Sequence, residues 1–286
     1  ITNQAGDGLI KTFNHGYLAV DFFFLLSGFV INYAYHDRWN KMTTVSFFKR
    51  RLIRLHPMLI MGAFIGLICF LIGGSMQWSG NTIPFYISII TFLLTCFMIP
   101  ALPGSFNEVR GNGELFPLNG PMWSLFFEYI GNILYALFIR RLSTKLLTLL
   151  VILLGILHSI FTIGNLSGYG NLGVGWTFDT INFCGGMLRM LFPFTLGMLI
   201  SRCFKAIKLP YPFFLSSILL ITTLSVPYLT AFKAINLNGI YESLCIIAIF
   251  PLILTIGASS QEKSKLSQTL GELSYPLYII HYPIMY

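Results

Sequence analysis

Long apolar stretches alternate with short polar connections along almost the whole chain. A helix that spans a bilayer needs about 20 largely apolar residues, and nine stretches approach that length. Because backbone polar groups cannot stay unpaired in hydrocarbon, each stretch is expected to be helical. The predicted helices lie near residues 17–35, 57–73, 83–102, 121–139, 146–163, 187–201, 211–230, 239–257 and 272–286. The pattern therefore predicts an all-α fold, a polytopic transmembrane helical bundle.

Composition supports the membrane class and excludes several others. Hydrophobic residues make up 55% of the 286 positions and charged residues 10%, against about 25% charged in soluble domains. The net charge of +8 comes from Lys and Arg in short clusters between apolar stretches, which is typical of charges that flank a bilayer. We therefore expect the lipid bilayer, and no nucleic acid, as a partner. The five cysteines contain no CxxC pair, so no disulfide framework and no metal site are expected.

The ends of the sequence look like those of a fragment truncated at both sides. Residue 1 is Ile, the first 16 residues are polar and Gly-containing, and the last apolar stretch stops at Tyr286. We expect one membrane-embedded domain over residues 1–286, with residues 1–16 as an extramembrane loop. Residues 164–186 form the longest connection without helical periodicity, and such loops often carry binding roles.

The membrane orientation does not follow from the loop charges if all nine stretches cross. Lys and Arg residues then divide eight against nine between the two sides, which decides nothing under the positive-inside rule. If one stretch between residues 57 and 139 did not cross, the basic cluster at 38–54 would share a face with the later clusters. We hypothesise a re-entrant or half-crossing element within 83–120.

Ionisable side chains inside apolar stretches are candidates for chemistry, because each costs roughly 2.5–3.5 kcal/mol on insertion scales. Arg189 and Glu242 lie near the predicted starts of their stretches and are expected to be structural. Glu128 lies deeper and has no cation within four positions, so it should take a partner from another helix or bind a proton. Asp21 shares a helix face with Gly28. Gly28 would permit close approach of another helix or a ligand, and Asp21 is equally expected to orient its helix start.

Two further patterns carry polar groups. Arg51 and Arg54 are three positions apart, so they share a helix face; they are either flanking charges of a membrane helix or guanidinium groups that bind phosphates. Near the end of the chain, Ser274 is expected to cap a helix that has Pro276 in its first turn. The residues Ser274, Tyr278 and His281 then form a polar stripe, either packed or lining a cavity.

Four segments resemble motifs of the acyltransferase 3 family of polytopic membrane enzymes, in the family's order. They are HGYLAVDFFFLLSGFVI, FFKRRLIRLHP, MWSLFFE and LGELSYPLYIIHYPI. The resemblance implies a ten-helix fold in the bacterial inner (plasma) membrane, of which this chain holds about nine helices. It also implies transfer of an acyl group, often acetyl, from acyl-CoA (acetyl-CoA) to a hydroxyl of a cell-surface carbohydrate or lipid-linked glycan.

The resemblance also assigns roles to individual residues. It places Arg51 and Arg54 in a paired-arginine motif that is proposed to contact acyl-CoA, and Ser124, Glu128 and His281 in later motifs. Together with Tyr278 of the polar stripe, Glu128, Ser124 and His281 are the candidate catalytic residues, and the adjacent Arg50 joins Arg51 and Arg54 as a candidate for coenzyme binding. Supporting roles fall to Asp21, Gly28, Trp123, Ser274 and Pro276. The family's first helix, with its candidate general-base histidine, should precede Ile1, and His15 does not replace that histidine. An alternative function is a transporter or flippase whose intramembrane carboxylates carry protons.

Overall fold

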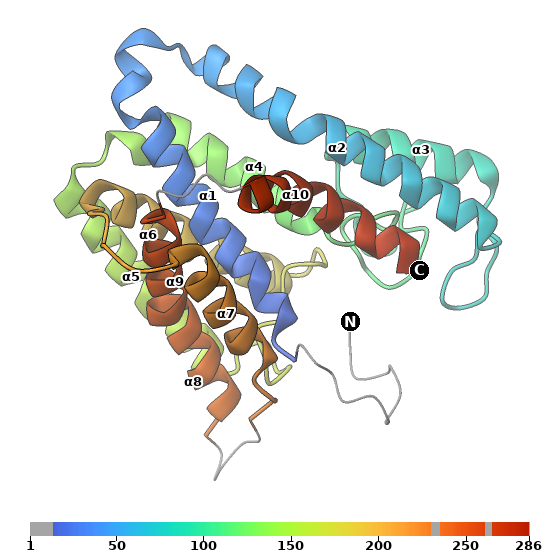
Figure 1. Cartoon of the computed structure of the whole chain (residues 1–286). Coiled ribbons are helices and arrows are strands. Elements are labelled where there is room, and N and C mark those ends of the chain that lie inside the picture. Colours follow the sequence, from blue (N-terminus) through green and yellow to red (C-terminus); the bar gives the residue numbers. More distant parts are fainter. Residues whose placement is uncertain (1–13, 230–234, 261–264, 286) are drawn as a thin grey trace.

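The computed structural model describes residues 14–229, 235–260 and 265–285, and its regular elements there are helical (Figure 1). A π-helical segment, η4 (Cys245–Ile249), joins α8 (Leu237–Leu244) and α9 (Phe250–Ala258) into one continuous helix, so the described residues form nine separate helices of at least 12 residues. The all-α prediction is confirmed. In chain order the helices are α1 (Ala19–Tyr35), α2 (Thr44–Ile72), α3 (Phe85–Cys96), α4 (Met122–Leu137), α5 (Thr144–Ile163), α6 (Thr180–Cys203), α7 (Pro212–Ser225), α8 (Leu237–Leu244), α9 (Phe250–Ala258) and α10 (Lys265–Met285).

Six of the described helices are long and apolar enough to cross a bilayer, so the protein is an integral membrane protein. Their outward faces keep large apolar side chains exposed, such as Ile53 at 65% and Leu149 at 63%, as lipid contact requires. By the same criterion of length and hydropathy, the prediction of nine membrane-spanning stretches is not met among the described residues. Helix α3 has 12 residues and extends roughly 18 Å, α7 is also short, and polar residues in the first half of α10 lower its hydropathy.

Two helices begin earlier than their apolar stretches predict, because polar side chains cap them. The Thr43 hydroxyl accepts a hydrogen bond from the Ser46 N–H, so α2 begins at Thr44 and Pro57 lies inside it. Asp179 caps α6 through the Asn182 N–H. Arg189 consequently lies inside a helix, not near its start as the sequence pattern predicted.

The predicted start of the last helix is also wrong. Helix α10 begins at Lys265, with Pro276 and Pro283 inside it. Ser274 is therefore no N-cap; its hydroxyl donates to the Gly271 carbonyl within the same helix, at 2.8 Å. Because Pro276 lacks an N–H, it removes one backbone hydrogen bond from this helix without ending it.

Close contact between α1 and α6 forms the centre of the bundle. A Cβ atom built on Gly28 would lie 1.9 Å from the Phe194 carbonyl oxygen, and one on Gly197 would lie 2.0 Å from that of Leu25. Only glycine permits this backbone approach, which was expected at Gly28. Helices α5, α7, α8 and α9 lie around this pair, whereas α2, α3 and α10 lie together on the other side of α4 (Figure 1).

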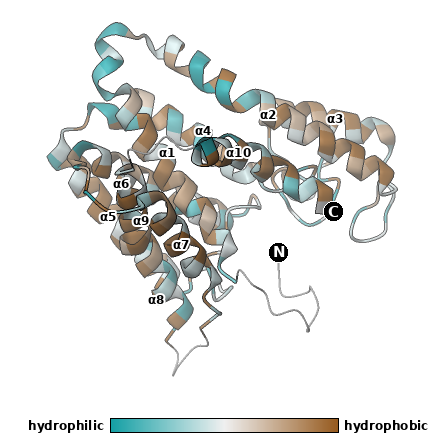
Figure 2. Cartoon of the chain, viewed as in Figure 1, coloured by the Kyte–Doolittle hydropathy of each residue, from teal (hydrophilic) through white to brown (hydrophobic). Residues whose placement is uncertain are grey.

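The cationic connections gather at one end of the molecule, which we call the basic end. It consists of η2 (His36–Lys41) with the start of α2, η3 (Ile139–Arg141) with the start of α5, the residues after α6, and the described ends of α9 and α10 that face each other in the sequence. The Arg140 guanidinium carbon lies 4.0 Å from the centroid of the Trp39 ring, and Arg202 donates to the Leu142 carbonyl. Figure 2 shows hydrophilic residues around η2 and the start of α2.

The opposite end is formed by residues 73–84, 97–121 and 164–179, where Leu115 N–H donates to the Trp176 carbonyl at 2.9 Å. Among the Lys and Arg side chains of the described connections, only Arg110 lies there. This asymmetry arises because α2 leaves the basic end, α4 returns to it, and the short α3 lies against α2. The arrangement agrees with the hypothesis of a half-crossing element in 83–120.

We expect the basic end to face the cytoplasm. In an otherwise cysteine-free background, single cysteines at Lys49, Lys145 and Lys208 should react with an impermeant thiol reagent from the same side of sealed vesicles. A cysteine at Arg110 should react from the other side. Labelling of the Lys49 and Lys145 positions from opposite sides would contradict this topology.

Candidate active site

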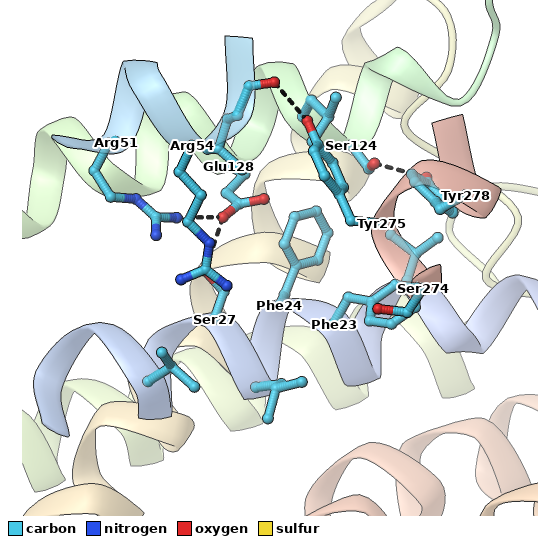
Figure 3. Close-up of a pocket in the computed structure, with 15 residues that line it drawn as sticks. Phe23, Phe24, Ser27, Arg51, Arg54, Ser124, Glu128, Ser274, Tyr275 and Tyr278 are labelled. Carbon is cyan, nitrogen blue, oxygen red and sulfur yellow. Dashed lines mark hydrogen bonds and ion pairs between the residues drawn. The ribbon is translucent and has the colours of Figure 1, made fainter. Parts of the chain in front are cut away.

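A cavity of about 200 Å³ lies where α1, α2, α4 and α10 meet (Figure 3). Helices α1, α2 and α4 each contribute both polar and apolar side chains, and α10 contributes three side chains that carry hydroxyl groups. The polar lining consists of Ser27, Arg51, Arg54, Ser124, Glu128, Ser274, Tyr275 and Tyr278, and the apolar lining of Val20, Phe23, Phe24, Leu26, Val30, Leu55 and Leu125. The four sequence segments that were singled out separately, one on each of these helices, thus meet at one site.

Glu128 holds three helices together through a single carboxylate oxygen. Its Oε1 accepts from Arg51 Nη2 of α2 at 2.6 Å and from Ser27 Oγ of α1 at 2.9 Å. The side chain of Arg51 is 6% exposed and that of Glu128 17%. The partner that Glu128 was expected to find on another helix is therefore Arg51. The second carboxylate oxygen takes part in neither bond and points toward the middle of the cavity in Figure 3.

The neighbouring arginines are placed differently. Arg54 is exposed, lines the cavity, and makes no hydrogen bond or ion pair with any residue in the described part of the chain. Arg50 is also exposed, but it is not part of the cavity lining.

Two hydroxyl groups form the other end of the polar lining. Ser124 Oγ and Tyr278 OH are 2.7 Å apart, and both lie within hydrogen-bond distance of the Pro121 carbonyl oxygen, at 3.0 and 3.2 Å. Two hydroxyl protons thus serve three contacts, so one contact is always unfilled. Nearby, Tyr275 OH donates to the Leu55 carbonyl at 2.8 Å and ties α10 to α2.

His281 lies outside the cavity lining, although its ring centroid is 5.7 Å from that of Tyr278. It is exposed, and its Nδ1 lies 2.7 Å from the Tyr278 carbonyl oxygen of its own helix. The predicted polar stripe therefore separates: Ser274 and Tyr278 line the cavity, whereas His281 does not. Pro276 is partly buried and also lies outside the lining.

A fully buried ion pair supports the cavity from behind. Asp21 of α1 accepts two hydrogen bonds from Arg189 of α6, at 2.6 and 3.1 Å. The Arg189 guanidinium also donates to the Tyr17 and Val174 carbonyls, and its carbon lies 5.0 Å from the centre of the Trp123 ring. Trp123 precedes Ser124 and packs edge-on against Phe24 of the cavity wall.

A second buried polar network lies beside this pair and away from the cavity. Glu242 accepts from the Tyr17 hydroxyl, from the Leu172 N–H at 3.1 Å and from the Asn238 amide at 3.0 Å. His15 joins it through Asn238, at 2.9 Å. These bonds attach the connection before α6 to α8, which agrees with the expected structural role of Glu242 and gives part of residues 164–186 a packing role.

Comparison with protein families now complements this geometry. The family model described as an acyltransferase domain, that of the acyltransferase 3 family, matches residues 2–286. The chain belongs to the acyltransferase 3 family. A relative from Rhizobium radiobacter, described as protein 2 in the picA locus, is 35% identical over 142 residues, which cover 45% of this chain and 69% of that protein. No solved structure matches the chain.

Family membership implies acyltransferase activity, and the resemblance stated from the sequence is confirmed. Of the intramembrane carboxylates invoked for the transporter alternative, Asp21 is fully buried and already paired with Arg189.

Sequence reasoning missed part of the acyltransferase's cavity. The sequence pattern did not single out Ser27, whose hydroxyl donates across helices to Glu128. The aromatic wall formed by Phe23 and Phe24 was not singled out either.

Replacing Asp21 by Asn should destabilise this acyltransferase strongly. Arg189 would remain buried without a counter-charge, and breaking a buried pair in this way costs about 3–5 kcal/mol. The Asp21→Asn variant should therefore show a lower melting temperature in detergent. The double variant Asp21→Leu/Arg189→Met, which removes both charges, should be no less stable than the single variant; a more severe loss would contradict this account.

Proposed function

We propose that this acyltransferase moves an acyl group, most simply acetyl, from acyl-CoA to a hydroxyl of a cell-surface carbohydrate or lipid-linked glycan in the bacterial inner membrane. The observation that carries the proposal is the cavity itself. It combines a carboxylate that has one oxygen without a hydrogen-bond partner among the described residues, an exposed guanidinium and a pair of hydroxyl groups in one largely apolar enclosure. These are the group types that acyl transfer between a thioester and an alcohol requires.

The chemistry divides into three tasks. A sugar hydroxyl attacks the thioester carbonyl, loses its proton to a base, and the thiolate of CoA leaves and is protonated. Glu128 orients the attacking hydroxyl or handles its proton through the carboxylate oxygen that neither Arg51 nor Ser27 contacts. One of the two hydroxyl protons of Ser124 and Tyr278 lies between the two groups, and the other points to the Pro121 carbonyl. This second proton can turn to the thioester oxygen as negative charge develops there, because the Pro121 carbonyl keeps the hydrogen bond from the Ser124 N–H at 3.2 Å.

The size of the cavity favours the acyl end of the donor. A volume of about 200 Å³ is smaller than the roughly 300–1,000 Å³ of pockets that enclose a whole ligand. We place the thioester and the acyl group among Phe23, Phe24 and Leu125. The phosphates of the coenzyme then remain outside, on the side of the cavity that carries Arg54 and faces the basic end. A guanidinium group is well suited to such phosphates.

The position of His281 argues against a direct catalytic role for it. Its exposed ring contacts the backbone and the ring of Tyr278 on its own helix and does not line the cavity. We therefore retain Glu128, Ser124 and Tyr278 as the proposed catalytic residues. Arg50 likewise has no support as a coenzyme ligand within the cavity, although it adds to the positive charge of the basic end.

Replacing Glu128 by Gln should lower transfer by about 10²- to 10⁴-fold, the usual contribution of a positioned acid–base group. The measurement is thiol release from acetyl-CoA in vesicles that contain the protein and a glycan acceptor. The exposed carboxylate Glu272 provides a matched control, and Glu272→Gln should keep normal transfer. Undiminished transfer by a folded Glu128→Gln variant would remove this residue from the site.

A further inference from the structure

The two arginines of the cavity differ in whether a neighbouring carboxylate already neutralises their positive charge. Arg51 is 5% exposed, and its Nη2 bonds to Glu128 at 2.6 Å. Its Nε is buried and has no hydrogen-bond partner among the described residues. The positive charge of Arg51 is therefore neutralised inside the protein.

If the Arg51 guanidinium left Glu128 to bind a ligand, the contacts among three helices would change. The oxygen that accepts from Arg51 also accepts from Ser27, so the same carboxylate joins α1, α2 and α4. Without Arg51, Glu128 would face a largely apolar enclosure with only a hydroxyl as its partner. Removing one member of a mostly buried pair is strongly unfavourable, so Arg51 is held in place.

Arg54 is in the opposite situation. It lies one helical turn further along α2, on the same face, and lines the cavity with an exposed guanidinium that has no partner in the described part of the chain. The backbone beside it is fixed, because Tyr275 OH bonds to the Leu55 carbonyl. Since Arg51 and Glu128 cancel, the net charge of the three side chains is that of Arg54.

We infer that the two arginines have different roles: Arg54 binds a phosphate group of acyl-CoA, and Arg51 is a positioning residue that fixes Glu128. The inference rests on the proposed function of the cavity. It assigns coenzyme affinity to Arg54 and the rate of transfer to Arg51, although both belong to the same short basic run.

The test separates binding from turnover. CoA binding to purified protein in nanodiscs and the kcat of acyl transfer are measured for Arg54→Gln, Arg51→Gln and the neighbouring exposed control Lys49→Gln. Arg54→Gln should weaken CoA binding by about 10- to 100-fold, as expected for loss of one charged hydrogen bond. Arg51→Gln should change CoA binding by less than about twofold, the scatter of independent sites, but lower kcat. Lys49→Gln should change neither CoA binding nor kcat.

A double-mutant cycle distinguishes positioning from a merely structural effect. Arg51→Gln/Glu128→Gln should have a kcat no lower than the slower single variant, because the two residues act as one unit. Arg54→Gln and Glu128→Gln should instead combine additively. If Arg51→Gln does not fold, Arg51→Lys replaces it in both measurements; it keeps the charge and should lower kcat without weakening CoA binding.

The possible failures are distinguishable. Equal loss of CoA binding in the Arg51 and Arg54 variants, with kcat unchanged, would overturn the division of roles but leave the proposed donor site in place. Unchanged CoA binding in both variants, with normal transfer, would overturn the proposed donor site and the division of roles together.

Discussion

The ion pair between Arg51 and Glu128 is the interaction on which the arrangement of the cavity depends. A carboxylate within a membrane-spanning helix requires a cation or a proton, because hydrocarbon solvates neither charge nor unpaired polar atoms. Here the cation comes from α2 and a hydroxyl donor comes from α1. The electrostatic requirement of one residue thus fixes the relative positions of three helices, and the space between them and α10 becomes the cavity.

The protein contains a second ion pair whose surroundings differ in an informative way. Asp21 and Arg189 are completely enclosed, and the carboxylate and guanidinium satisfy each other and nearby carbonyl groups. The pair of Arg51 and Glu128 faces a cavity and has one carboxylate oxygen outside the pair's bonds. A fully bonded pair can only hold helices together, whereas a partly bonded pair beside a cavity can also contact a substrate.

Much of the fold followed from hydrophobic pattern, because the bilayer leaves few alternatives to helices. The close approach at Gly28 and the need of Glu128 for a distant partner were also predictable from residue type. The starts of α2, α6 and α10 were not, since caps by Thr43 and Asp179 and a proline tolerated inside α10 extend helices beyond their apolar stretches. The separation of His281 from Tyr278 depends on the path of α10 past its neighbours, which no local pattern encodes.

The topology and the cavity support each other. Because α3 is too short to cross alone, the connections with most of the described cations meet at one end, and Arg54 lies within a few turns of that end of α2. Helix α4 runs toward the basic end, so its first turn, which carries Ser124, lies on the other side of Glu128. A multiply charged coenzyme cannot cross a bilayer unaided. Under the proposed function, the donor therefore reaches the cavity from the basic end, and the hydroxyl pair lies at the side left open to the acceptor.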